Sequence, residues 1–223
     1  LLDALRIRTI SDFARFLPGK VWFILARVHL CKKYKIPSDI IVFSVLLEEY
    51  LNIFSTLLLF ITIFFVVAHP ILTTYAFYLF LFIPIPFLIL HPRFFKPFLR
   101  LVAQFLKRPY VSFQIRYSYL VSLLSVFFVA WILLGLGFYF MTTSLYHVDA
   151  SLILPLIGVF AIAWAAGFLI IILPGGLGLR EAVLSYLLSF FVPLPIAIIV
   201  SLLSRLWLIS GEALTALIFR LVK

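Results

Sequence analysis

Charged residues are scarce in this chain. Asp, Glu, Lys and Arg make up 12% of the 223 residues and hydrophobic residues make up 65%, whereas soluble domains have about 25% charged and roughly 45–50% apolar residues. This composition excludes a soluble globular protein and predicts a polytopic membrane protein. The formal net charge is +10, but the basic residues form short clusters between apolar runs, as membrane-protein loops do. That distribution argues against a nucleic-acid partner, which needs a basic groove on a soluble surface.

Motifs of catalysis and metal binding are also missing. The single cysteine, Cys31, excludes an internal disulfide. The four histidines show no spacing typical of metal ligands, and "GGLG" fits neither a phosphate-binding loop nor a dinucleotide-binding turn. No nucleophile elbow is present either. The sequence therefore predicts that the chain is not an enzyme and has no metal site or cofactor.

Long apolar runs dominate instead. A helix needs about 20 apolar residues to cross the hydrocarbon of a bilayer. Five runs are long enough: Ile40–Ala68, Ile71–Leu90, Leu120–Met141, Leu152–Leu173 and Pro193–Phe219. The predicted fold is all-α, a polytopic transmembrane helical protein with a single membrane domain over residues 1–223. The chain starts with Leu1 rather than Met, and we expect further residues upstream.

Basic clusters predict the orientation. One precedes the first run and another fills the connection after the second run: Arg27, Lys32, Lys33 and Lys35, and then Arg93, Lys96, Arg100, Lys107, Arg108 and Arg116. By the positive-inside rule both clusters face the cytoplasm. The connections "HPILTT" and "TTSLYHVDAS" hold no Lys or Arg and are predicted to lie outside. We therefore expect a multi-pass protein of the plasma membrane whose basic loops and carboxyl terminus are cytoplasmic.

One predicted crossing lacks a partner. Leu152–Leu173 is expected to run inward, yet Pro193–Phe219 must also end inside. The only apolar piece between them, Ala182–Phe191, gives about 15 Å of helix, half of a crossing. A broken, re-entrant helix resolves this conflict, with "PGGLGLRE" at a bend inside the membrane. Irregular backbone at that depth needs a protein cover or a wet cavity, so we expect this stretch to line a polar cavity.

A similar break occurs near the start of the chain. Leu17-Pro18-Gly19 repeats Leu173-Pro174-Gly175, and the two prolines are 156 positions apart. A long apolar run that carries charges follows each break, so residues 1–118 and 119–223 are predicted to be inverted-repeat-like halves. Interrupted segments at matching places in two halves indicate a transporter site near the midplane. The predicted bends are Pro18, Gly19, Pro174, Gly175, Gly176 and Gly178.

Charged side chains inside the runs are the candidate site. Two runs each carry a polar stripe on one helix face: Ser44, Glu48, Asn52 and Ser55, and Ser201, Arg205 and Glu212. A charge at bilayer depth costs about 2.5–3.5 kcal/mol on insertion scales, which indicates function where several occur together. A structural alternative stays open, in which Glu48 pairs with Arg205 and the glycines serve close helix packing.

The motifs resemble a known family. "LPGKVWFILAR", the glutamate pair in the first long run, "ILPGGLGLREA" and "SRLWLISGE" are together similar to the membrane domain of the lysylphosphatidylglycerol synthase/flippase family, which also occurs as free-standing flippase-like proteins. The resemblance covers most of the chain, and PGGLGLREA is its most specific part. It implies two repeat-related halves with re-entrant helices around a central cavity. Synthase members also carry a soluble lysine-attaching domain and usually begin with further spans; no such domain is encoded here, so synthesis is not implied.

The resemblance implies lipid translocation. We expect a flippase-like protein that moves a phospholipid or a polyprenyl-linked lipid between leaflets through a central polar cavity. Arginines and free backbone N–H groups after the glycines would bind an anionic or polyprenyl-phosphate headgroup, and carboxylates would receive a cationic moiety or hold the arginines. The candidate headgroup-binding residues are Arg180, Arg205, Glu181, Glu48, Glu49, Glu212, Lys20 and Arg27.

A second hypothesis treats the chain as a non-transporting membrane partner or scaffold of a glycosyltransferase or another lipid-modifying enzyme. It predicts copurification with that enzyme and no lipid movement by the isolated chain. The sequence leaves the identity of the lipid and the oligomeric state open, a homo-oligomer included.

Overall fold

The computed structural model describes residues 2–17, 21–67, 116–169, 176 and 178–221. Within these residues the fold is all-α, as predicted, with seven α-helices: α1 Leu2–Asp12, α2 Trp22–Cys31, α3 Ser38–Val67, α7 Tyr117–Leu145, α8 Ile153–Leu169, α9 Leu179–Leu188 and α10 Leu194–Leu221. Three 3-10 helices join them: η1 Phe13–Phe16, η2 Lys32–Tyr34 and η3 Ala150–Leu152. The predicted run Ile71–Leu90 lies outside the described residues, as do the predicted site residues Pro18, Gly19, Lys20, Pro174 and Gly175.

Four of these helices are long and apolar enough to cross a membrane. The candidate spans are Ser38–Ile63, Tyr117–Leu145, Ala150–Phe168 and Leu194–Arg220. Together they suggest a multi-pass membrane protein. The other three helices, α1, α2 and α9, have 11, 10 and 10 residues, and a ten-residue helix extends only about 15 Å.

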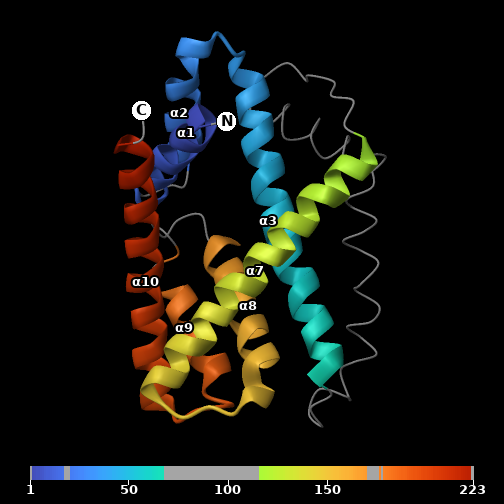
Figure 1. The fold of residues 1–223 in the computed structure, drawn as a ribbon, viewed down its shortest axis with the longest axis vertical. Helices are drawn as coiled ribbons and strands as arrows, with labels where there is room; N and C mark the ends of the chain where they lie inside the picture. The colour runs from blue at the N-terminus through green and yellow to red at the C-terminus, as the bar shows by residue number, and fades with distance from the viewer. Residues whose placement is uncertain (1, 18–20, 68–115, 170–175, 177, 222–223) are drawn as a thin grey trace.

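The long helices α3, α7 and α10 run between the two ends of the molecule, and α7 crosses obliquely (Figure 1). α1 and α2 lie at the end of the molecule where α3 begins, close to the end of α10. α3 and α7 both run from this end to the opposite end, where α8 begins. α10 then runs back along the length of the molecule, so both chain termini lie at the same end.

α8 and α9 form a helical hairpin. α8 ends and α9 begins about half-way along α10, and α9 runs from there back to the end where α8 began (Figure 1). The two helices approach closely at Gly167, where an added Cβ would lie 2.7 Å from the Cβ of Arg180. At Gly176, where φ is +69°, an added Cβ would lie 2.6 Å from the carbonyl oxygen of Gly167. Only glycine fits this part of the turn, because a side chain meets both steric overlap and an unfavourable backbone conformation.

The main hydrophobic core lies among α7, α8, α9 and α10, and Leu59 and Ile63 of α3 also belong to it. Its largest fully buried members include Phe138 of α7 and Phe160 of α8, whose rings stack with centroids 4.7 Å apart. Gly135 lets α7 approach α8, since a Cβ there would lie 2.7 Å from Cγ2 of Ile157. A second core cluster joins α3 to α7, close packing of the kind that holds helices together inside a bilayer.

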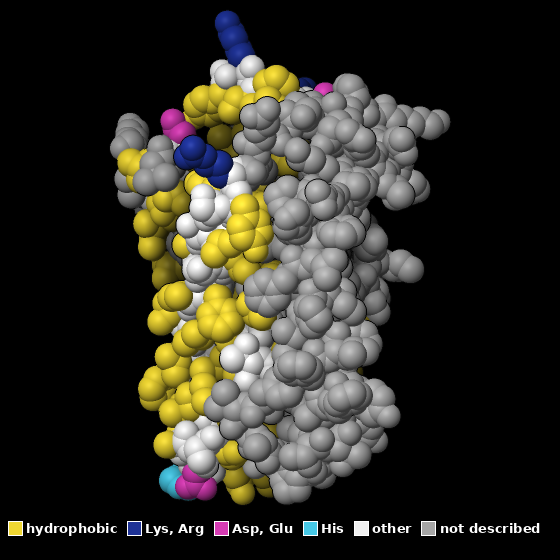
Figure 2. All heavy atoms as spheres, turned by 90° about the vertical axis from the view of Figure 1, so that its right-hand side faces the viewer, with side chains coloured by type: hydrophobic (Ala, Val, Ile, Leu, Met, Phe, Trp, Pro, Cys, Tyr) yellow, Lys and Arg dark blue, Asp and Glu magenta, His cyan; other side chains and the backbone are white. Residues whose placement is uncertain are grey.

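The outer face of α7 is apolar, and no other described helix covers it. Tyr119, Val126, Leu133 and Phe140 follow one another at seven-residue intervals and are between 62% and 66% exposed. On the face drawn in Figure 2 the described side chains are mostly hydrophobic along its length, and charged side chains and histidine lie near the two ends. An apolar stripe of this length would be a liability in water, whereas contact with lipid accounts for it.

Candidate functional site

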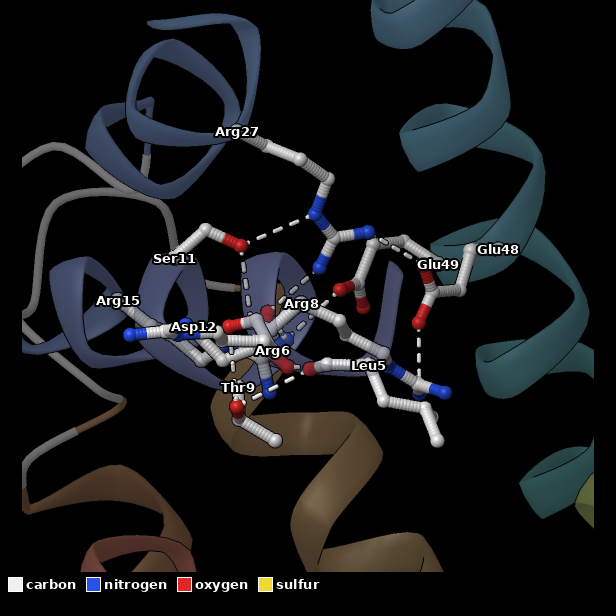
Figure 3. Close-up of polar contacts among 10 residues, drawn as sticks. All are labelled: Leu5, Arg6, Arg8, Thr9, Ser11, Asp12, Arg15, Arg27, Glu48 and Glu49. Carbon is white, nitrogen blue, oxygen red and sulfur yellow. Dashed lines mark hydrogen bonds and ion pairs between the residues drawn. The ribbon is translucent and has the colours of Figure 1, made fainter. Parts of the chain in front are cut away.

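The first of two ion networks joins α1, α2 and α3 through the buried Arg27 (Figure 3). Its guanidinium donates from Nε to Ser11 Oγ at 3.0 Å, from Nη1 to Glu48 Oε2 at 2.6 Å and from Nη2 to Asp12 Oδ1 at 2.7 Å. Arg8 pairs with the other oxygen of Glu48, with Nη2 and Oε1 2.6 Å apart. Three helices are therefore held together by one buried guanidinium, which is fully engaged by its neighbours.

Arg15 belongs to the same network and comes from η1. Its Nη2 donates to Glu49 Oε1 at 2.8 Å, and its guanidinium lies 5.4 Å from the centroid of the Phe23 ring. Burial disfavours the charge on Arg15, but nearby carboxylates outweigh this effect and raise the pKa of the guanidinium: Glu49, Asp12, Glu212 and Glu48. Arg15 therefore stays charged at every physiological pH.

The second network joins α9 to α10 through Glu181. One oxygen of this carboxylate, Oε1, accepts a hydrogen bond from Arg205 Nη1 at 2.7 Å. The other oxygen, Oε2, accepts from the backbone N–H of Gly178 at 2.8 Å. Gly178 has φ of +88° and stands directly before α9. Glu181 thus caps the first turn of α9 and ties the hairpin turn to α10.

Arg180 is the least engaged arginine of this second network. Its Nη2 donates to Ser204 Oγ at 3.2 Å, and its Nη1 lies 3.5 Å from Glu181 Oε1. The guanidinium also lies 5.5 Å from the centroid of the Phe160 ring. Arg180 is only 5% exposed, and its Nε is buried without a hydrogen-bond partner in the described structure. Because buried donors normally have partners, this one is free for an anion, as is the buried Nε of Arg15 in the first network.

Glu212 of α10 lies between the two networks. Its Oε2 is buried and has no hydrogen-bond partner among the described residues. Three charged groups act on this carboxylate electrostatically, Arg15 and Asp12 from the first network and Arg180 from the second. Glu212 is therefore within electrostatic range of charged groups from both networks.

The predicted site residues are distributed over both networks. Arg27, Glu48 and Glu49 lie in the first, and Arg180, Glu181 and Arg205 lie in the second. Glu48 binds Arg8 through one oxygen and Arg27 through the other, and Arg205 binds Glu181. The sequence left open a pair between Glu48 and Arg205, and the structure gives each of them a different partner. In the polar stripe of α3, Asn52 accepts a hydrogen bond from Trp131 Nε1 at 2.9 Å and thereby links α3 to α7.

The sequence reasoning missed five members of the networks. They are Arg8, Asp12, Arg15, Ser11 and Ser204. The first three stand at i, i+4 and i+7, the spacing of one helical face. That spacing was a usable signal, but it falls in a stretch that hydropathy does not mark as membrane-embedded.

Within the described residues no group of three or more His, Cys, Asp or Glu side chains is arranged to hold a metal ion. Comparisons with protein-family models, with curated proteins and with solved structures found no match for this chain. Function is therefore inferred from the geometry and charge of the two networks.

Proposed function

We propose that this chain is a lipid translocase, which moves a lipid with an anionic headgroup between leaflets past the two ion networks. The observation that carries the proposal is a buried guanidinium, that of Arg180, with an unused donor beside the turn of a helical hairpin. Four charged members of the networks, Glu48, Glu49, Arg205 and Glu212, lie on helices long enough to span a bilayer, where a charge costs about 2.5–3.5 kcal/mol. A free buried donor at such a site is expected to serve a passing anion.

We further propose that α2 and α9 are re-entrant helices of two inverted repeats. The offset of 156 residues between the two Leu-Pro-Gly segments places Trp22, the first residue of α2, against Gly178, which directly precedes α9. The same offset places Ser38 against Leu194, so α3 and α10 begin at equivalent positions. α3 and α10 run in opposite directions (Figure 1). Matching helix pairs of opposite direction are the arrangement of inverted-repeat transporters.

In this mechanism the headgroup passes through the polar site while the lipid tails stay in the hydrocarbon. Arg180 binds the headgroup phosphate, for which its planar guanidinium is well suited. Arg205 holds Glu181 and so positions the start of α9, whose first N–H groups favour negative charge. Arg27, which is fully bonded, holds α1, α2 and α3 together. The resemblance to the lysylphosphatidylglycerol synthase/flippase family agrees with this mechanism.

The test is transbilayer movement in proteoliposomes that contain a fluorescent, dithionite-reducible phosphatidylglycerol. Arg180→Ala should slow the movement at least about tenfold, because one lost charged hydrogen bond is worth about 1.5–3 kcal/mol. Arg220→Ala is the matched control, since this arginine is exposed at the end of α10, and it should move lipid at the wild-type rate. An Arg180→Ala variant that is folded and as fast as wild type would remove Arg180 from the mechanism.

One observation favours the second candidate, a non-transporting membrane partner of a lipid-modifying or glycosyltransferase enzyme. Four of the five carboxylates in the networks are already bound to arginines at short distances, as expected of a static scaffold. This candidate predicts that the pure wild-type chain moves no lipid and that an enzyme copurifies with it under mild extraction.

A further inference from the structure

Glu212 differs from every other carboxylate of the two networks. Asp12, Glu48, Glu49 and Glu181 each have an arginine nitrogen within 2.8 Å. Glu212 has no ion pair within 4.0 Å in the described part of the chain, and its Oε2 is buried without a hydrogen bond. Glu49 Oε2 is buried without a hydrogen bond as well, but the other oxygen of Glu49 accepts from Arg15, so Glu212 differs in having no arginine on either oxygen. A buried carboxylate oxygen that lacks a donor is costly in its ionised form, and a proton removes that cost.

The charged side chains that act on Glu212 come from the neighbouring elements that carry charged residues. Asp12 comes from α1, Arg15 from η1 and Arg180 from α9, while α7 carries no charged residue. On α10 itself, Arg205 stands two turns earlier and is bound to Glu181. Two arginines and one carboxylate thus act on Glu212 at a distance, and none of them hydrogen-bonds to its buried oxygen.

The charges of the two networks balance. The described ion pairs, together with Glu212, contain five arginines and five carboxylates: Arg8, Arg15, Arg27, Arg180 and Arg205, and Asp12, Glu48, Glu49, Glu181 and Glu212. With all of them ionised, the site has no net charge to offer an anion. An incoming phosphate would therefore bring an uncompensated charge into a poorly solvated region, which is expensive.

We propose that Glu212 takes up one proton from water when the site binds one anionic lipid headgroup, and that lipid and proton cross together. This inference rests on the proposed translocase function and adds a coupling ion to it. The protonated Glu212 leaves the site with one positive charge in excess, which the headgroup neutralises. The carboxylate becomes a carboxylic acid on loading and returns the proton to water when the lipid leaves. The loaded site is again neutral, so the membrane potential does not oppose the joint movement of the lipid and the proton.

The test is proton uptake during binding. The purified chain in detergent, weakly buffered and with a pH-indicator dye, is titrated with a short-chain phosphatidylglycerol. About one proton should be taken up per lipid bound, and the affinity should fall about tenfold per pH unit on the alkaline side, as linkage requires for one proton. A short-chain phosphatidylcholine, which is zwitterionic, should bind without proton uptake.

Three variants locate the proton. Glu212→Gln should bind phosphatidylglycerol without proton uptake and with an affinity that does not change with pH. Glu212→Asp, which keeps an acid, should retain the uptake. Asp149→Asn is the matched control, since it removes an exposed carboxylate beyond the end of α7, and it should behave like wild type.

The outcomes separate the two proposals. Wild-type binding without proton uptake, undiminished uptake in Glu212→Gln, or no binding of phosphatidylglycerol at all overturns the proton site. Proton-linked binding without lipid movement in proteoliposomes leaves the proton site standing and removes the translocase function. Lipid movement at a rate independent of pH leaves the translocase function standing and removes the proton site.

Discussion

Arg27 shows how a single residue holds the amino-terminal helices in place. Its side chain is 10% exposed and binds Glu48 and Asp12. Replacing one partner of a buried ion pair leaves the other charge uncompensated, which costs about 3–5 kcal/mol. We therefore expect Arg27→Ala to lower the free energy of unfolding by about that amount, measured by reversible unfolding in micelles with a rising fraction of dodecyl sulfate.

Arg8 provides the comparison for Arg27. It binds the same carboxylate, Glu48, but its side chain is 47% exposed. Water screens an exposed pair, so Arg8→Ala should cost at most about 1 kcal/mol. Equal losses in the two variants would contradict the central position given to Arg27.

Individual site residues were predictable where their chemistry conflicts with their surroundings. Glu48, Glu181 and Arg205 are conspicuous because ionised groups are rare in apolar sequence. Arg8 and Asp12 belong to a polar helix that hydropathy does not mark as membrane-embedded, so their helical spacing was the only signal for them. Their partners on other helices are distant in the sequence, Glu48 for Arg8 and Arg27, 15 residues away, for Asp12, so only the folded chain reveals the pairs.

At the scale of elements, Gly176 makes the closest approach to another element that the glycines of the described residues show. Gly176→Ala places a Cβ against the backbone of Gly167 and forces alanine to a φ of +69°. A residue in such a conformation costs about 1–3 kcal/mol, and we expect the variant to lose at least that much stability in the same micelle assay. Gly211→Ala is the control, because no atom lies within 4 Å of a Cβ there and alanine favours the helix. A Gly176→Ala variant as stable as Gly211→Ala would show that the turn is looser than described.

Hydropathy located the long helices well. The predicted runs begin at Ile40, Leu120 and Pro193, and the helices begin at Ser38, Tyr117 and Leu194. The count of crossings predicted a short element before the last span, and α9 is that element, although it starts at Leu179 rather than Ala182. α1 was not predicted, because its charged residues break the apolar pattern and its place depends on ion pairs with other helices.

At the scale of the whole molecule, the two ends differ in the charge of their connections. The connection between α2 and α3 carries Lys32, Lys33 and Lys35, whereas the α7–α8 connection at the opposite end (Figure 1) has no Lys or Arg. The positive-inside rule therefore predicts that the first connection lies in the cytoplasm.

Cysteine labelling tests this orientation. In a Cys31→Ala background, a membrane-impermeant maleimide should label His147→Cys in intact cells and Lys33→Cys only after permeabilisation. Both positions are exposed, so accessibility within the fold does not limit the reaction. The reverse pattern would invert the orientation, and labelling of both positions in intact cells would contradict a membrane between them.

The short ion pairs of the two networks have a consequence for biogenesis. Every arginine–carboxylate pair among the described residues joins segments that are close in the chain, either within α1 to α3 or within α9 and α10. When α3 or α10 leaves the ribosome, the partners of Glu48, Glu49 and Arg205 have already been synthesised. Each group of helices can thus enter the lipid with these charges neutralised, without waiting for the other group. Glu212, whose charged neighbours include Arg15 and Asp12 from the start of the chain, completes its surroundings only when the last helix docks.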